Sequence, residues 1–122
     1  MFKLKTKWFN KWAKKNSISD ELLLKALDDL SKNFGTSNLG SGLYKVRTKR
    51  TGKGKSGGYR TLVAFKEMDR AIFIYGFSKT ERDNLEIDEL KSFKKLAKDL
   101  LKISQDEYNR QEKLGNFFRL ED

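Results

Sequence analysis

The first third of the chain changes from alternating to helical spacing of its apolar residues. Phe2 to Lys5 alternate apolar and charged side chains, which predicts a short strand. From Lys7 to Lys15 the apolar side chains fall on one helix face and lysines occupy most of the other. For Trp8 and Trp12 on this helix we expect packing in the core rather than stacking on a ligand, which is the alternative. The segment therefore predicts a strand followed by an amphipathic helix.

A second helix is predicted from about Asp20 to Lys32, where apolar residues recur at helical spacing behind a serine-rich cap. We expect Gly35 to supply the left-handed residue that ends it. Residues 36–42 then form a glycine-bearing connection.

Three strand-like segments follow in the middle of the chain. They are Leu43 to Thr48, Tyr59 to Phe65 and Ala71 to Phe77. The short link between the last two predicts an antiparallel hairpin. Both of its strands are apolar at nearly every position, as we expect for central strands of a sheet covered on one side.

The C-terminal part is predicted to be mainly helical. A third helix begins near Ile87, and the capping-box pattern from Ser104 to Glu107 predicts a break before a fourth, shorter helix. Gly115 ends that helix, and residues 117–120 add an edge strand or cover a groove. The order of elements predicts one α+β domain over residues 1–122, with a small antiparallel-rich sheet, two N-terminal helices packed against it, and C-terminal helices.

The amino-acid composition limits the kinds of reaction that the protein can catalyse. The 122 residues are 37% hydrophobic, enough to bury a core, and include neither cysteine nor histidine. This excludes disulfides, cysteine nucleophiles and zinc sites built on those residues, so we expect no metal and no cofactor. Acid–base chemistry must use Lys, Tyr, Asp or Glu. No apolar run approaches the length of a membrane span, and the first 15 residues lack a signal-peptide core, so we expect a cytoplasmic protein without a membrane partner.

The charge is concentrated in one part of the sequence. The net charge is +10, with +12 in residues 1–66 and −2 in residues 67–122. Positions 45–60 hold no acid and seven cations, namely Lys45, Arg47, Lys49, Arg50, Lys53, Lys55 and Arg60. Such a run repels itself unless a polyanion binds it, and this favours nucleic acid as the partner.

The run divides into strand and loop. A phosphate-binding P-loop would need glycine at Lys49 and a helix after the loop, so we reject that motif. Lys49, Arg50, Lys53 and Lys55 lie in a glycine-rich loop that either contacts RNA backbone or is simply solvated.

The position of each cation along its strand determines the face of the sheet to which its side chain points. Lys45 and Arg47 share one face, while Tyr44 and Val46 face the helices. If the strands are neighbours, Arg60 and Lys79 converge with Lys45 and Arg47 on the open face.

Several short motifs resemble signatures of RelE-type toxins. They are Tyr44-Lys45-Val46-Arg47, Gly58-Tyr59-Arg60-Thr61-Leu62-Val63 and Gly76-Phe77-Ser78-Lys79, and the Gly-Lys-Ser-Gly-Gly insert resembles the HigB-like branch. The resemblance implies the toxin of a bacterial toxin–antitoxin pair that cleaves mRNA, typically on the ribosome. It also implies a cognate antitoxin, for which we expect the helix-turn-helix type.

In that family, Lys and Arg at the positions of Lys45, Arg47 and Arg60 surround the scissile phosphate. RNA is cut when its own 2′-OH attacks the phosphorus, so an enzyme must move protons and stabilise negative charge. Arg47 and Arg60 can hold the phosphate through bidentate hydrogen bonds and stabilise its negative charge. Lys45, whose pKa we expect its cationic neighbours to lower, is the candidate acid or base.

Arg47 stands where RelE proteins often carry a second lysine, and arginine cannot exchange a proton. Either Lys53, Lys55 or Lys79 then takes the other proton-transfer role, or the activity is slow or different. Lys79 completes the catalytic candidates. Tyr75 or Phe77 is a candidate for stacking a base, with core packing as the alternative, and Arg82 is a further candidate nucleic-acid contact.

Two other functions stay open. One is a ParE-like toxin that blocks a protein target such as DNA gyrase, which needs no cation cluster. The other is a nucleic-acid-binding module without catalysis.

Overall fold

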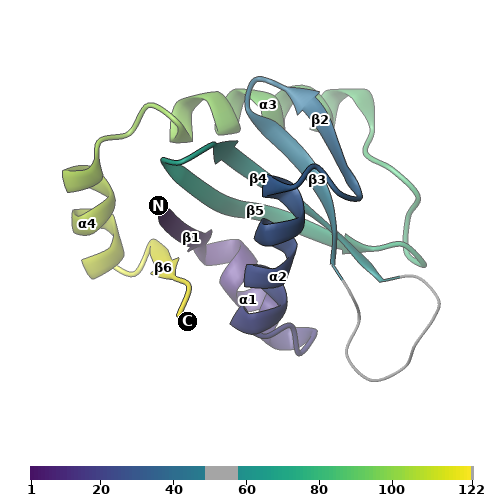
Figure 1. Cartoon of the computed structure of the whole chain (residues 1–122), viewed down its shortest axis with the longest axis horizontal. Coiled ribbons are helices and arrows are strands. Elements are labelled where there is room, and N and C mark those ends of the chain that lie inside the picture. The colour runs from purple at the N-terminus through teal and green to yellow at the C-terminus, as the bar shows by residue number, and fades with distance from the viewer. Residues whose placement is uncertain (49–57, 122) are drawn as a thin grey trace.

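The strands form one sheet with the order β2-β3-β4-β5-β1-β6 (Figure 1). The computed structural model describes residues 1–48 and 58–121. Neighbouring strands are antiparallel except β1 and β5, which are parallel. The strands are β1 (Phe2–Thr6), β2 (Thr36–Gly40), β3 (Leu43–Thr48), β4 (Tyr59–Lys66), β5 (Arg70–Ser78) and β6 (Phe117–Arg119).

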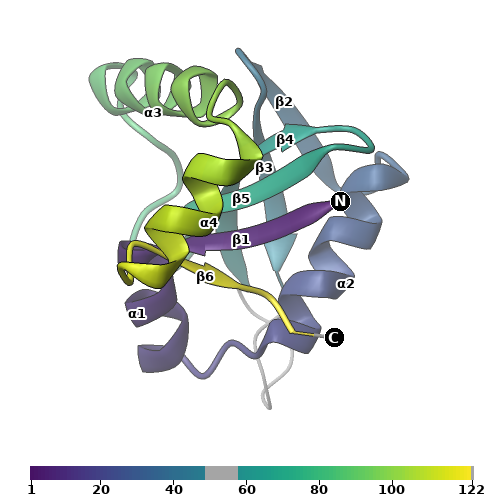
Figure 2. The same cartoon turned by 90° about the vertical axis from the view of Figure 1, so that its left-hand side faces the viewer.

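Four helices in the described part of the chain accompany the sheet. They are α1 (Lys7–Lys15), α2 (Asp20–Ser31), α3 (Ile87–Leu100) and α4 (Gln105–Lys113). Figure 2 shows α3 and α4 on one side of the sheet and α2 on the other. The predicted α+β class, with two N-terminal helices against the sheet and helices at the C-terminal end, is confirmed.

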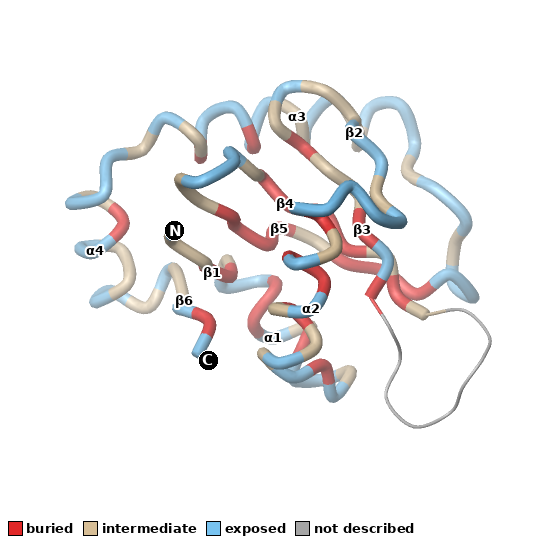
Figure 3. The backbone as a smooth tube through the Cα atoms, in the orientation of Figure 1, coloured by how far each residue is buried: buried red, intermediate tan, exposed pale blue. Residues whose placement is uncertain are grey.

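Both faces of the sheet are covered, so the prediction of a sheet covered on one side is wrong. Phe73 of β5 packs in a core with α1 and α2, while its neighbour Ile72 packs in a second core with α3 and α4. On β4, Val63 packs in the core with α1 and α2, and Leu62 packs in the core with α3 and α4. Successive side chains of a strand point to opposite faces of the sheet. When both faces are covered, nearly every position is therefore buried and apolar. Accordingly, most of β4 and β5 is buried (Figure 3).

The end of α2 differs from the sequence prediction. Asn33 has a φ of 55°, and the amide of Phe34 donates to the carbonyl of Asp29 at 2.8 Å. Asn33 is therefore the left-handed residue that closes the helix, while Gly35, with a φ of 66°, is also left-handed but lies two residues further on. The predicted connection of residues 36–42 also contains β2, because the turn at Gly40–Gly42, with positive φ at all three residues, folds the segment back to pair with β3.

The two tryptophans of α1 differ in burial. Trp12 packs over Gly76, where an added Cβ would lie 2.3 Å from the ring. Trp8 is 47% exposed, so core packing was a wrong prediction for this residue. Phe9 and Ala13 occupy the centre of the helix face and leave Trp8 at its margin.

The C-terminal predictions are confirmed. α3 begins at Ile87, and the hydroxyl of Ser104 caps α4 by accepting from the amide of Glu107 at 3.1 Å. β6 is an edge strand beside β1. No helix in the described ranges is both long and apolar enough to cross a bilayer.

Replacing Gly76 by alanine should destabilise the protein by about 1–3 kcal/mol, because the new methyl group overlaps the Trp12 ring. Urea unfolding measures the change. In a Trp12→Leu background the same alanine should cost much less, since the ring is gone. An equal cost in both backgrounds would show that the contact with Trp12 is not the cause.

Candidate functional site

The pairing of β3 with β4 places three cationic side chains on one face of the sheet. Arg47 lies directly opposite Arg60, and Lys45 lies opposite Leu62. Because alternate residues of a strand share a face, all three cations point to the side where Leu62 packs, the side of α3 and α4. β2 adds Ser37, which is the register partner of Lys45.

Buried threonines support this pairing from the opposite face. The hydroxyls of Thr48 and Thr61 lie 3.2 Å apart, and Thr61 donates to the carbonyl of Val46 at 3.2 Å. Both threonines are almost completely buried. A slip of one residue would leave these hydroxyls without partners, so they favour the register that opposes the two arginines.

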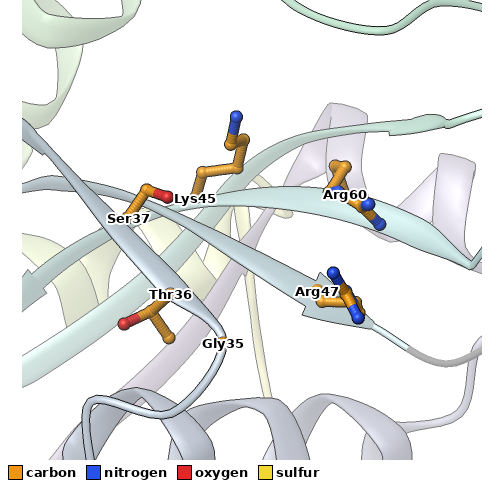
Figure 4. A pocket seen from close by; sticks show the side chains of 6 residues that line it. All are labelled: Gly35, Thr36, Ser37, Lys45, Arg47 and Arg60. Atoms are coloured by element: carbon orange, nitrogen blue, oxygen red, sulfur yellow. The ribbon is translucent and has the colours of Figure 1, made fainter.

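The cations line an open cavity of about 370 Å³. Its wall comes from the start of β2 and from β3 and β4, with the residues Gly35, Thr36, Ser37, Lys45, Arg47 and Arg60. In Figure 4 the guanidinium groups of Arg47 and Arg60 lie beside each other, and the Lys45 side chain extends above β3.

No acid lines this cavity, and none of its three cations forms an ion pair within residues 1–48 and 58–121. Burial, and then the charge of Arg47, lower the pKa of Arg60. Like charges directly opposite each other on paired strands are destabilising. A bound anion would relieve that repulsion, and two planar guanidinium groups match the oxygens of a phosphate.

The other predicted catalytic residue lies apart from this wall. Lys79 follows the end of β5, is exposed, and is not among the residues that line the cavity. Lys49, Arg50, Lys53 and Lys55 lie outside the described residues. The structure thus brings together Lys45, Arg47 and Arg60 of the predicted set.

Tyr75 and Arg82 have partners within the protein. The Tyr75 ring stacks on Trp8 with 4.6 Å between centroids and contacts the tilted ring of Phe93 on α3 at 4.8 Å. The Arg82 guanidinium pairs with the carboxylate of Glu89 through two nitrogens and lies over the ring of Phe77.

The sequence patterns predict a connection where β2 forms, so they do not reveal the cavity wall formed by Gly35, Thr36 and Ser37. The signal was Thr36, a β-branched residue, together with the Gly-Ser-Gly turn at 40–42 just before the next strand. Within the described residues, no group of three or more acidic, histidine or cysteine side chains is placed to hold a metal ion.

A comparison with protein families matches residues 1–120 to the family described as the RelE toxin of the RelE/RelB toxin–antitoxin system. The chain belongs to the RelE toxin family. Comparisons with curated proteins and with solved structures found no match. The family implies that this RelE-type toxin has a cognate antitoxin, and the match agrees with the α+β fold described above.

Removing one arginine of the pair should stabilise this RelE-type toxin when no ligand is bound. Arg47→Gln is expected to raise the free energy of unfolding by up to about 1 kcal/mol at low ionic strength, because repulsion with Arg60 is lost. The gain should shrink in high salt. Thermal melts at two salt concentrations measure it, with Lys95→Gln on α3 as control. A loss of stability that salt does not change would contradict the repulsion.

Acid should weaken the contact between Arg82 and Glu89. Hydrogen bonds from Arg82, and then from the Glu86 backbone, lower the pKa of Glu89 from 4.5 to about 2. The stabilisation is therefore complete above pH 4.5 and is lost as the pH falls through 2. The melting temperature of the wild type should fall more steeply over this range than that of Glu89→Gln. Parallel curves would exclude this ion pair as a source of stability.

Proposed function

We propose that this RelE-family toxin is an endoribonuclease that cuts mRNA at a phosphodiester held between Arg47 and Arg60. The observation that carries the proposal is their direct opposition across paired strands, in a cavity that no acid among the described residues lines. An arrangement of like charges is costly in the free protein, and a phosphodiester anion offsets that cost.

The reaction uses the 2′-OH of the RNA as nucleophile. Its oxygen bonds to the adjacent phosphorus, the bond from phosphorus to the 5′-oxygen breaks, and the products carry a 2′,3′-cyclic phosphate and a 5′-OH. One group must accept the proton of the 2′-OH, and a proton must reach the departing 5′-oxygen. Arg47 and Arg60 remain protonated and stabilise the charge that develops on the phosphate oxygens.

Lys45 is the candidate for proton transfer. It lines the same cavity as the two arginines, and an amine can act as acid or base whereas a guanidinium cannot. Lys79, Lys53 or Lys55 is the candidate for the second proton transfer. Ser37, the register partner of Lys45, adds a hydroxyl that can donate to a phosphate oxygen.

We further propose that the substrate is mRNA on the ribosome, that the protein acts in the cytoplasm, and that the antitoxin is of the helix-turn-helix type. The net charge of +10, with seven cations and no acid at positions 45–60, supports a polyanionic partner.

Expression of the wild type should arrest growth and create new mRNA 5′ ends, which sequencing of 5′ ends maps. Arg60→Ala should lower cleavage by about 10²-fold or more, because it removes a donor to the developing charge. Lys95→Ala on the exposed face of α3 should cut like the wild type. Adding naked RNA or translating ribosomes to purified protein then separates free from ribosome-dependent cleavage.

Growth arrest without new 5′ ends in the wild type, persisting in Arg60→Ala, would overturn the nuclease proposal. It would instead favour a toxin that blocks a protein target.

A further inference from the structure

α1 carries an unneutralised set of charges. Its four lysines, at positions 7, 11, 14 and 15, are exposed, and none forms an ion pair with any described residue. The neighbouring helix behaves differently: Lys25 pairs with Asp29 at 2.7 Å and Lys32 at the end of α2 pairs with Asp28 at 3.0 Å. α1 contains no acid that could do the same.

The same helix presents an exposed aromatic ring. Trp8 is 47% exposed although it is stacked on Tyr75 at 4.6 Å and 26°. Tyr75 also contacts Phe93, whose ring is tilted by 32°, so the Tyr75 ring is engaged within the protein. Trp8 also lies parallel to Trp12 at 6.1 Å and 13°, and it is nevertheless the exposed member of this aromatic group. Lys11 and Lys15 follow Trp8 by three and seven residues, which places them on the same side of the helix.

This stack lies on the cavity side of the sheet. Tyr75 pairs with Leu62 and Leu62 pairs with Lys45, so one row crosses three strands. Two spacings between strands separate the backbones of Lys45 and Tyr75, roughly 10 Å. Tyr75 packs with the core on the side of α3 and α4, the face toward which Lys45 points. Trp8 therefore reaches, from α1, the face that carries the cations.

We propose that Trp8 and the lysines of α1 form a second contact for single-stranded RNA, beside the cavity of Lys45, Arg47 and Arg60. Trp8 stacks a base of the substrate while Lys11 and Lys15 contact backbone phosphates. A single strand is required because a base can stack on a side chain only when it leaves its own stack. This inference rests on the proposed function, and it assigns to α1 binding rather than catalysis.

The test uses a 2′-O-methyl RNA oligonucleotide, which lacks the nucleophilic 2′-OH, and measures binding by fluorescence anisotropy. Trp8→Leu should weaken binding about tenfold, because a stacked base is lost. Lys11→Gln combined with Lys15→Gln should lower the slope of log K against log salt by about 1.4. The oligonucleotide should also quench tryptophan emission in the wild type but not in Trp8→Leu.

The matched control is Lys91→Gln with Lys95→Gln, which removes from α3 two exposed lysines that form no ion pair with the described part of the chain. It should leave the salt slope unchanged. If the α1 variants bind like this control, or if duplex RNA binds through α1 equally well, the inference is overturned. Cleavage of natural RNA by the wild type separates the two proposals. If RNA binds through α1 but is not cleaved, the nuclease proposal is contradicted and the RNA contact on α1 is not.

Discussion

The candidate site depends on the register between β3 and β4, which forces Arg47 and Arg60 to face each other. No acid in residues 1–48 and 58–121 lines their cavity, so repulsion between the two arginines destabilises the strand pairing that places them opposite each other. Buried hydrogen bonds of Thr61 to Thr48 and to Val46 on the opposite face favour the same register. A stable sheet thus maintains an electrostatically unfavourable arrangement, which a phosphate would turn into a favourable one.

The two cores explain why such an arrangement persists. Val63 and Phe73 pack against α1 and α2, while Leu62 and Ile72 pack against α3 and α4, so β4 and β5 are fixed from both sides. The cations of β3 and β4 occupy the part of the cavity-side face that the core leaves open. Rigid strands hold the guanidinium groups in place, and such preorganisation is what stabilises developing charge in a reaction.

Much of this arrangement could be predicted from sequence, because strand parity alone places Lys45 and Arg47 on one face and Val46 on the other. Local patterns do not determine which strands are neighbours, so the opposition of Arg47 and Arg60 needed the structure. Thr36 to Gly40 lacks a clear alternation of apolar residues, so the sequence does not predict β2 or the contribution of Ser37 to the cavity wall. Trp8 was misassigned because helix spacing cannot distinguish the centre of an apolar face from its margin.

The most direct test of the account is to observe the two guanidinium groups while RNA binds. In NMR spectra, the Nε–Hε signals of Arg47 and Arg60, assigned with the Arg47→Gln and Arg60→Gln variants, can be followed as 2′-O-methyl RNA is added. Both signals should shift together, with one dissociation constant that matches binding of the RNA. Saturable binding that leaves both signals unchanged would contradict it.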